Sequence, residues 1–132
     1  MRSILIDELL AAEVEAVIAY LDTHAERASL ERLYWIKLEP ELWGEAQRQA
    51  WGNADAAPVY RLAVEVGTDW ARFELLVRSE NLRNIGGGQA DEAQTLFMLR
   101  WIEAMAAELN LASCRCAAPA ARPPAAPSLS GG

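Results

Sequence analysis

The chain has 132 residues, 52% of them hydrophobic, and a formal net charge of −7. This length suits a single domain whose core needs neither disulfides nor a structural metal. The excess of acidic residues repels phosphate backbones and anionic lipid headgroups, so we expect no nucleic acid and no membrane among its partners. Asp7 and Glu8 interrupt the apolar start of the chain, which argues against a secretory signal and favours a cytoplasmic location.

The composition changes at about Leu111. The segment that follows is rich in Ala, Pro, Ser and Gly and has few large apolar side chains. Such a segment buries too little surface to offset the entropy lost when it becomes ordered. We therefore expect one globular domain over residues 1–111 and a disordered tail over residues 112–132.

The first predicted helix runs from about Asp7 to Glu26. Apolar residues recur in it at spacings of three and four, which is the pattern of one helix face. These residues are Leu10, Val14, Val17, Ile18, Leu21 and Ala25. The preceding segment from Ile4 to Ile6 is either the first turn of this helix or a short lead-in.

A strand is predicted from about Leu33 to Leu38. Alternation places Tyr34 and Ile36 on one face of this strand and Leu33 and Trp35 on the other. Pro40 then stands at a favoured first helical position and predicts a short helix as far as Trp51.

The segments 59–66 and 70–78 alternate in hydrophobicity and predict a β-hairpin. Gly67 and Thr68 between them fit a two-residue turn with glycine first. In that register three apolar pairs share one face, and an opposite-charge pair lies on the other face, with Arg72 diagonal to Glu65. The expected direct pairs are Val64 with Ala71, Leu62 with Phe73, Tyr60 with Leu75, and Arg61 with Glu74.

The last predicted helix runs from about Ala90 to Leu109 and is apolar over a wide face that includes Leu96 and Leu99. The predicted fold is therefore α+β, a small two-layer sandwich in the order α-β-α-β-β-α. Its antiparallel sheet consists of the hairpin 59–78 and the strand 33–38, packed by two long helices. Three strands make a small sheet, so either further segments form strands or a partner extends it.

The loop before the last helix contains Gly86, Gly87 and Gly88. Its spacing matches neither of the common nucleotide-binding glycine patterns, and Asp91 and Glu92 place negative charge where a phosphate would bind. A flexible connector is the favoured interpretation. A mobile flap over a cleft is the alternative, and it supports a second functional class, a small-molecule binder or enzyme with its cleft near this loop.

Cys114 and Cys116, both in the expected tail, are weak candidates for a metal or redox role. A structural zinc site needs four ligands, and His24 lies at the end of the first helix, far from both cysteines in the sequence. We expect no cofactor. No set of catalytic residues is identified, so the sequence favours a protein that is not an enzyme.

The five tryptophans give more information about function than the two cysteines and the single histidine do. If the predicted strands pair, the sheet face opposite Tyr34 and Phe73 carries apolar residues beside arginines, a composition typical of protein interfaces. The interface candidates are Leu33, Trp35, Trp70, Leu76, Arg61 and Arg72. In the alternative interpretation, the short helix after Pro40 covers this face with Leu42 and Trp43.

The sequence therefore predicts a non-enzymatic protein-binding or self-associating module whose partner is another protein or a second copy. In bulk properties, namely small size, acidity and an α/β sandwich, the chain is similar to bacterial secretion chaperones; the likeness involves no motif. The alternatives are the small-molecule binder or enzyme near Gly86 to Gly88 and the metal or redox role of the tail cysteines.

Overall fold

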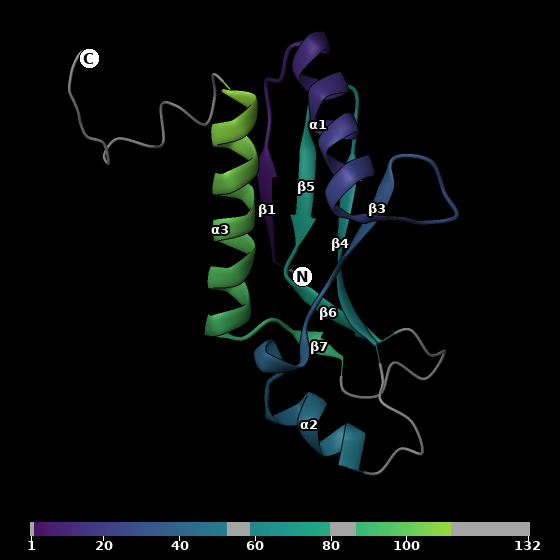
Figure 1. Ribbon diagram of the computed structural model, residues 1–132, viewed down its shortest axis with the longest axis vertical. Coiled ribbons are helices and arrows are strands. Elements are labelled where there is room, and N and C mark those ends of the chain that lie inside the picture. Colours follow the sequence, from purple (N-terminus) through teal and green to yellow (C-terminus); the bar gives the residue numbers. More distant parts are fainter. Residues whose placement is uncertain (1, 53–58, 80–86, 112–132) are drawn as a thin grey trace, which may run out of the picture.

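The computed structural model describes residues 2–52, 59–79 and 87–111. An antiparallel sheet forms one layer, and two long helices pack on one of its faces (Figure 1), which confirms the predicted α+β class. The helices are α1 Ala11–His24, α2 Glu45–Gly52 and α3 Glu92–Leu109, with a 3-10 turn η1 over Pro40–Leu42. The strands are β1 Ser3–Ile6, β2 Glu26–Arg27, β3 Leu33–Lys37, β4 Tyr60–Val66, β5 Ala71–Glu74, β6 Leu76–Ser79 and β7 Gly88–Gln89.

The strand order is β1-β5-β4-β3-β2, and β6 pairs with β4 on one side and with β7 on the other. Strands β5 and β6 are two parts of one segment that is interrupted at Leu75. The Leu75 N–H donates to the Arg2 carbonyl at 2.9 Å, and the Leu75 carbonyl accepts from the Ala90 N–H at 3.0 Å. Strands β1 and β7 therefore follow one another along the same side of this segment.

The core lies between the sheet and helices α1 and α3. Strand β4 supplies the centre of the core with four side chains that are at most 3% exposed: Tyr60, Leu62, Val64 and Val66. The helices cover them with Val14, Val17, Leu21, Met98, Ile102 and Met105, all 7% exposed or less. Full burial of one such apolar side chain stabilises the folded state by roughly 1.5–3 kcal/mol, so burial in this layer is the main favourable contribution to the free energy of folding.

Helix α1 begins four residues later than the sequence predicts. The segment that the sequence left undecided, Ile4 to Ile6, belongs to strand β1 and pairs with β5. Glu8 turns the chain with a φ of 57°, and the Leu10 N–H donates to Glu13 Oε1 at 2.8 Å where the helix starts. Leu10 is 68% exposed, so its predicted place on the buried stripe is wrong.

The predicted hairpin forms, but its register is shifted by two residues. Val64 lies opposite Phe73, not Ala71, and Val66 takes Ala71 as its partner. The Gly67 N–H donates to the Trp70 carbonyl at 2.8 Å, so the turn encloses Thr68 and Asp69, one residue later than the expected turn residues Gly67 and Thr68. A shift of two preserves which face each side chain occupies, so the faces are as predicted.

The remaining predicted pairs of the hairpin also change partners. Because the strand is interrupted at Leu75, Tyr60 lies opposite Ser79, and Arg61 lies opposite Arg78. The expected pairs of Tyr60 with Leu75, Leu62 with Phe73, and Arg61 with Glu74 are therefore wrong. Glu65 lies directly opposite Arg72, not diagonal to it.

The short helix after Pro40 is divided into the turn η1 and helix α2. Between them, Trp43 is 5% exposed, and its indole Nε1 donates to the Leu38 carbonyl at 3.1 Å. Its ring meets Tyr60, which lies on the helix-facing side of the sheet, edge-on at 5.2 Å. Trp43 therefore packs into the core at the end of the sheet.

Helix α3 is joined to this segment by a buried amide. Gln94 is 1% exposed, and its Nε2 donates to the Leu42 carbonyl at 3.0 Å and to Gln47 Oε1 at 3.1 Å. The predicted apolar face of α3 is partly wrong, since Leu96 and Leu99 are 48% and 41% exposed. The expected tail 112–132, with Cys114 and Cys116, lies outside the described residues.

The C-terminal end of α1 is fixed to the β2–β3 hairpin by three polar side chains. Asp22 Oδ1 accepts from Arg27 Nε at 2.8 Å and from the Tyr34 hydroxyl at 3.0 Å. The hydrogen bond from Arg27 lowers the pKa of Asp22 below its ordinary value. Burial, followed by the hydrogen bond to Asp22, raises the pKa of Tyr34.

We expect Gln94→Ala to lower the free energy of unfolding by about 1–3 kcal/mol, because it leaves the Leu42 carbonyl and the Gln47 amide oxygen without this donor. Urea unfolding followed by circular dichroism measures the change. The control is Gln49→Ala on the exposed side of α2, which should change stability by less than about 0.5 kcal/mol. Equal effects of the two substitutions would contradict this role of Gln94.

We also expect Asp22→Asn to lower the melting temperature at pH 7. Because the Asp22 pKa is lower in the folded protein, its carboxylate stabilises the fold above the unfolded-state pKa of about 4. That contribution is lost as the pH falls through the lowered, folded-state pKa, so the two melting temperatures should converge in acid. Thermal unfolding of both proteins between pH 7 and pH 2 tests this, and a constant difference would refute it.

Candidate functional site

The sheet face turned away from α1 and α3 is here called the outer face. Residues that lie directly opposite one another in an antiparallel pair point to the same side, which fixes its membership. One row runs across it from Leu5 through Arg72 and Glu65 to Leu33. The outer face comprises Ser3, Leu5, Glu26, Leu33, Trp35, Lys37, Arg61, Ala63, Glu65, Trp70, Arg72, Glu74, Leu76, Arg78 and Gln89.

Trp35 lies near the middle of the outer face and is half-buried. The guanidinium of Arg61 stands 4.4 Å from the centre of its ring, a cation–π geometry. Arg61 also lies 3.7 Å from the carboxylate of Glu26, which faces Trp35 across the sheet. Ala63, the other neighbour of Trp35, is only 4% exposed although it lies on this face, because the larger side chains around it cover it.

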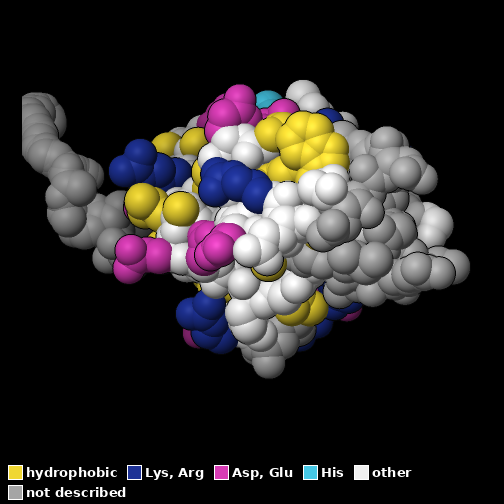
Figure 2. Space-filling model, turned by 90° about the horizontal axis from the view of Figure 1, so that it is seen from below, with side chains coloured by type: hydrophobic (Ala, Val, Ile, Leu, Met, Phe, Trp, Pro, Cys, Tyr) yellow, Lys and Arg dark blue, Asp and Glu magenta, His cyan; other side chains and the backbone are white. Residues whose placement is uncertain are grey.

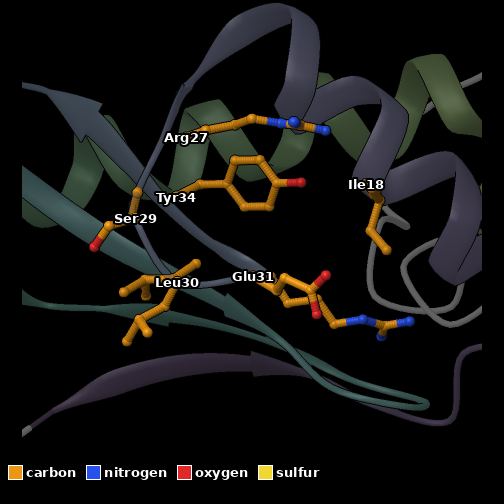
Figure 3. A pocket seen from close by; sticks show the side chains of 9 residues that line it. Ile18, Arg27, Ser29, Leu30, Glu31 and Tyr34 are labelled. Carbon is orange, nitrogen blue, oxygen red and sulfur yellow. The ribbon is translucent and has the colours of Figure 1, made fainter.

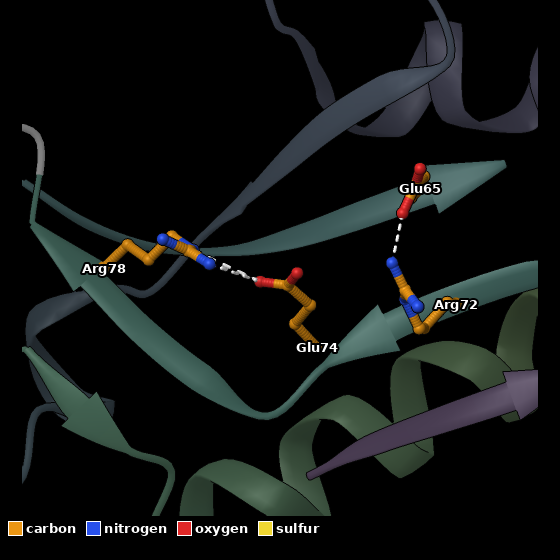
Figure 4. Close-up of polar contacts among 4 residues, drawn as sticks. All are labelled: Glu65, Arg72, Glu74 and Arg78. Carbon is orange, nitrogen blue, oxygen red and sulfur yellow. Dashed lines mark hydrogen bonds and ion pairs between the residues drawn. The ribbon is translucent and has the colours of Figure 1, made fainter. Parts of the chain in front are cut away.

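A second pair of an aromatic ring and an arginine lies at the β4–β5 turn. The guanidinium of Arg72 is 5.6 Å from the ring of Trp70 and forms an ion pair with Glu65 on the neighbouring strand (Figure 4). The indole of Trp70 lies against Gly67, where a Cβ atom would collide with the ring. Glycine at position 67 therefore allows the tryptophan to fold back over the turn.

The interruption at Leu75 aligns a third charged pair. Arg78 Nε and a terminal guanidinium nitrogen donate to Glu74 Oε1 at 3.2 and 3.1 Å (Figure 4). The Glu74 side chain is only 13% exposed, so this ion pair is better shielded from water than a typical surface pair. Leu76 lies between Glu74 and Arg78 in the sequence. Its side chain is half-buried and lies on the same side of the strand as theirs.

The charge of the outer face differs from that of the whole chain. It carries four basic side chains, Lys37, Arg61, Arg72 and Arg78, against three acidic ones, Glu26, Glu65 and Glu74. The chain as a whole has a net charge of −7. Acidic residues therefore concentrate elsewhere, and the outer face is close to neutral.

All six predicted interface residues lie on this face, but they form two centres, Trp35 with Arg61 and Trp70 with Arg72. The alternative, in which the short helix covers the face, does not hold for Leu42 and Trp43, because both pack on the core side. The sequence analysis missed Leu5, which is 54% exposed. The sequence signal for Leu5 was the apolar segment from Ile4 to Ile6. This segment does not alternate between apolar and polar residues, so it does not show which face Leu5 occupies.

A pocket of about 490 Å³ lies at the turn between β2 and β3, next to α1 (Figure 3). Three of its polar side chains, Arg27, Arg32 and Tyr34, already have partners within the protein. Arg27 and Tyr34 bond to Asp22, and Arg32, which has a φ of 62°, donates to the Gly67 carbonyl at 2.7 Å. This pocket is not the cleft expected near Gly86 to Gly88, and Gly86 lies outside the described residues.

Side chains that bind metals do not gather into a cluster in the part of the chain that the structure describes. No three His, Cys, Asp or Glu side chains there are placed to hold a metal ion. His24, the chain's one histidine, is exposed and stacks on Tyr20 with ring centres 4.0 Å apart. None of the helices within the described ranges has the length and apolar character of a membrane span.

Seen from the end where α2 lies, the surface alternates between acidic, basic and apolar side chains (Figure 2). Among the residues that the structure describes, the large exposed apolar side chains are Leu5, Leu10, Leu30, Trp51, Leu96 and Leu99. Comparison of the chain with protein-family models, curated protein sequences and solved structures gives no match.

We expect Gly67→Ala to destabilise the protein by about 1–3 kcal/mol, because the added methyl group overpacks the contact with Trp70. The same substitution in a Trp70→Ala background should cost clearly less, since the colliding ring is gone. Urea unfolding of all four proteins gives the coupling energy between the two positions. Equal costs in both backgrounds would show that the Trp70 ring does not constrain residue 67.

Proposed function

We propose that this protein is a non-enzymatic protein-binding module and that the outer face of its sheet receives the partner. The observation that supports this proposal best is the pair of half-buried tryptophans, Trp35 and Trp70, each held by an arginine on the same face. Tryptophan and arginine are the residue types that carry most of the binding energy in protein interfaces.

The contacts that hold these side chains in fixed positions support a rigid binding surface. Arg61 is placed between Trp35 and Glu26, and Arg72 lies between Trp70 and Glu65, so each guanidinium has a fixed position before a partner arrives. Side chains ordered in advance lose little conformational entropy on binding. The same arginines present planar donors at the border of the apolar surface, where interfaces place their polar groups.

Charge supports a protein as the partner. The near-neutral outer face avoids the repulsion that the acidic remainder of the molecule exerts on other acidic proteins. It combines exposed leucine at Leu5 and half-buried leucine at Leu33 and Leu76 with the two aromatic centres. A partner surface with apolar anchors and carboxylates at its border complements this arrangement.

We expect a double substitution, Trp35→Ser with Trp70→Ser, to abolish capture of the partner while the protein stays folded. The immobilised wild-type protein, this variant and a control, Leu10→Ser, are each exposed to a lysate of the source cell, and bound proteins are quantified by mass spectrometry. Leu10 is exposed at the start of α1 and is not part of the outer face. The partner is any protein retained by the wild type and the control and lost by the double variant.

Circular dichroism and urea unfolding of the three proteins exclude a loss of capture through unfolding. Cross-linking of the retained complex, followed by peptide mapping, should place the contacts on β3, β4 and β5. If the double variant retains the same proteins in the same amounts as the wild type, the outer face is not the binding surface and the proposal fails.

A further inference from the structure

Strand β1 ends the sheet, and the described residues place no strand beyond it. The hydrogen bond from Leu75 to the Arg2 carbonyl identifies which residues of β1 bond to the rest of the sheet. Bonded and non-bonded pairs alternate in an antiparallel ladder, so Ile4 and Ile6 direct their backbone groups toward β5. Ser3 and Leu5 direct their N–H and C=O groups outward. The backbone of an added strand would accept hydrogen bonds from these N–H groups and donate hydrogen bonds to these C=O groups.

The two edges of the sheet differ in how well they are protected. Strand β2, at one end, has two residues, Glu26 and Arg27, and both are charged. Strand β1, at the other end, reads Ser-Ile-Leu-Ile and has neither a charge nor a proline. Charged and very short edge strands are the usual protection against pairing with another chain, and β1, with four residues and no charge, is less protected than β2.

Exposed leucines lie along the same border of the molecule. Leu5 belongs to β1, and Leu96 and Leu99 lie on α3, which runs beside β1 (Figure 1). Trp101 on α3 meets Tyr20 of α1 edge-on at 5.4 Å, so that flank of α3 faces α1. At 100° per residue, Leu99 lies about 160° around the helix from Trp101 and therefore faces away from α1. Leu96 lies about 60° from Leu99 around the same helix.

We propose that β1 is a dimerisation strand, which pairs antiparallel with β1 of a second copy of this chain. A two-fold axis at Ile4 places Ser3 opposite Leu5 of the second copy, and Leu5 opposite its Ser3. These are the residues with outward backbone groups, so two pairs exchange four backbone hydrogen bonds. The two sheets become one, and Leu96 and Leu99 of the two copies approach each other on the helix side.

A second copy is the occupant that we assign, because a two-fold axis at Ile4 lets β1 pair with itself through both residues that have outward backbone groups, Ser3 and Leu5. An isologous interface needs such self-complementarity, since the same patch serves both subunits. The edge strand is also uncharged, so the net charge of −7 on each copy does not act at the point of contact. This edge adjoins the outer face that we propose for the partner protein and shares Ser3 and Leu5 with it, whereas Trp35 and Trp70 lie on other strands.

Light scattering over a wide range of concentrations tests the proposal. We expect the wild-type protein to have twice the chain mass of 14.5 kDa and the variant Leu96→Glu with Leu99→Glu to have the mass of one chain. Ser3→Pro should also yield a monomer, because it removes an outward N–H and leaves the bonds to β5 intact. Circular dichroism and urea unfolding confirm that each variant is folded.

Two control variants separate this proposal from the proposed function. Leu10→Glu adds a charge at a leucine that is 68% exposed and lies outside both β1 and α3, so this variant should remain a dimer. Trp35→Ser with Trp70→Ser should also remain a dimer while losing the partner protein. A wild-type monomer at all concentrations overturns the proposal. So does a dimer that survives the edge substitutions, or one that only the outer-face substitution dissociates.

A cross-link tests the register. In a background with Cys114→Ser and Cys116→Ser, a mixture of Ser3→Cys and Leu5→Cys proteins should form a disulfide-linked dimer on oxidation, because directly opposite residues stand about 5.5 Å apart. Each variant alone should give far less, since equivalent positions are not opposite one another. Efficient linkage of either variant with itself, or none in the mixture, overturns the two-fold axis at Ile4.

Discussion

Strand β4 is the constraint on which the rest of the molecule depends. It is the one strand in the described residues that pairs with β3, β5 and β6, and four of its side chains form the centre of the core. Its alternate residues, Arg61, Ala63 and Glu65, form the middle of the outer face. A single strand thus sets both the packing of the helices and the spacing of the charged and aromatic side chains on the opposite side.

Alternation of side chains predicts the faces of the sheet but not its register. Registers that differ by two residues place every side chain on the same face, so hydrophobicity does not separate them. The register follows from the position of the turn, which encloses Thr68 and Asp69 in place of Gly67 and Thr68 and brings the Trp70 ring against Gly67. The interruption at Leu75 depends on hydrogen bonds to Arg2 and Ala90, which lie far away in sequence.

The sequence predicts which residues belong to the candidate site, but it does not predict how these residues are arranged relative to one another. The sequence placed Trp35 and Trp70 on one face because strand periodicity is local. It did not predict which arginine holds which ring, since that depends on the register, nor that Glu74 would pair with Arg78 in place of Arg61. It also missed Leu5, because three consecutive apolar residues do not distinguish a strand from the first turn of a helix.

The pairing of β1 with β5 joins segments that lie roughly 70 residues apart in the chain. During synthesis β1 emerges first, and it remains without its partner until β5 has been made. Contacts of this separation form slowly, because a long loop must close before they contribute. Until closure, β5 also accepts the β1 segment of a neighbouring copy, at a rate that rises with the concentration of the protein. Exchange of the N-terminal strand between copies therefore competes with correct folding wherever the protein is concentrated.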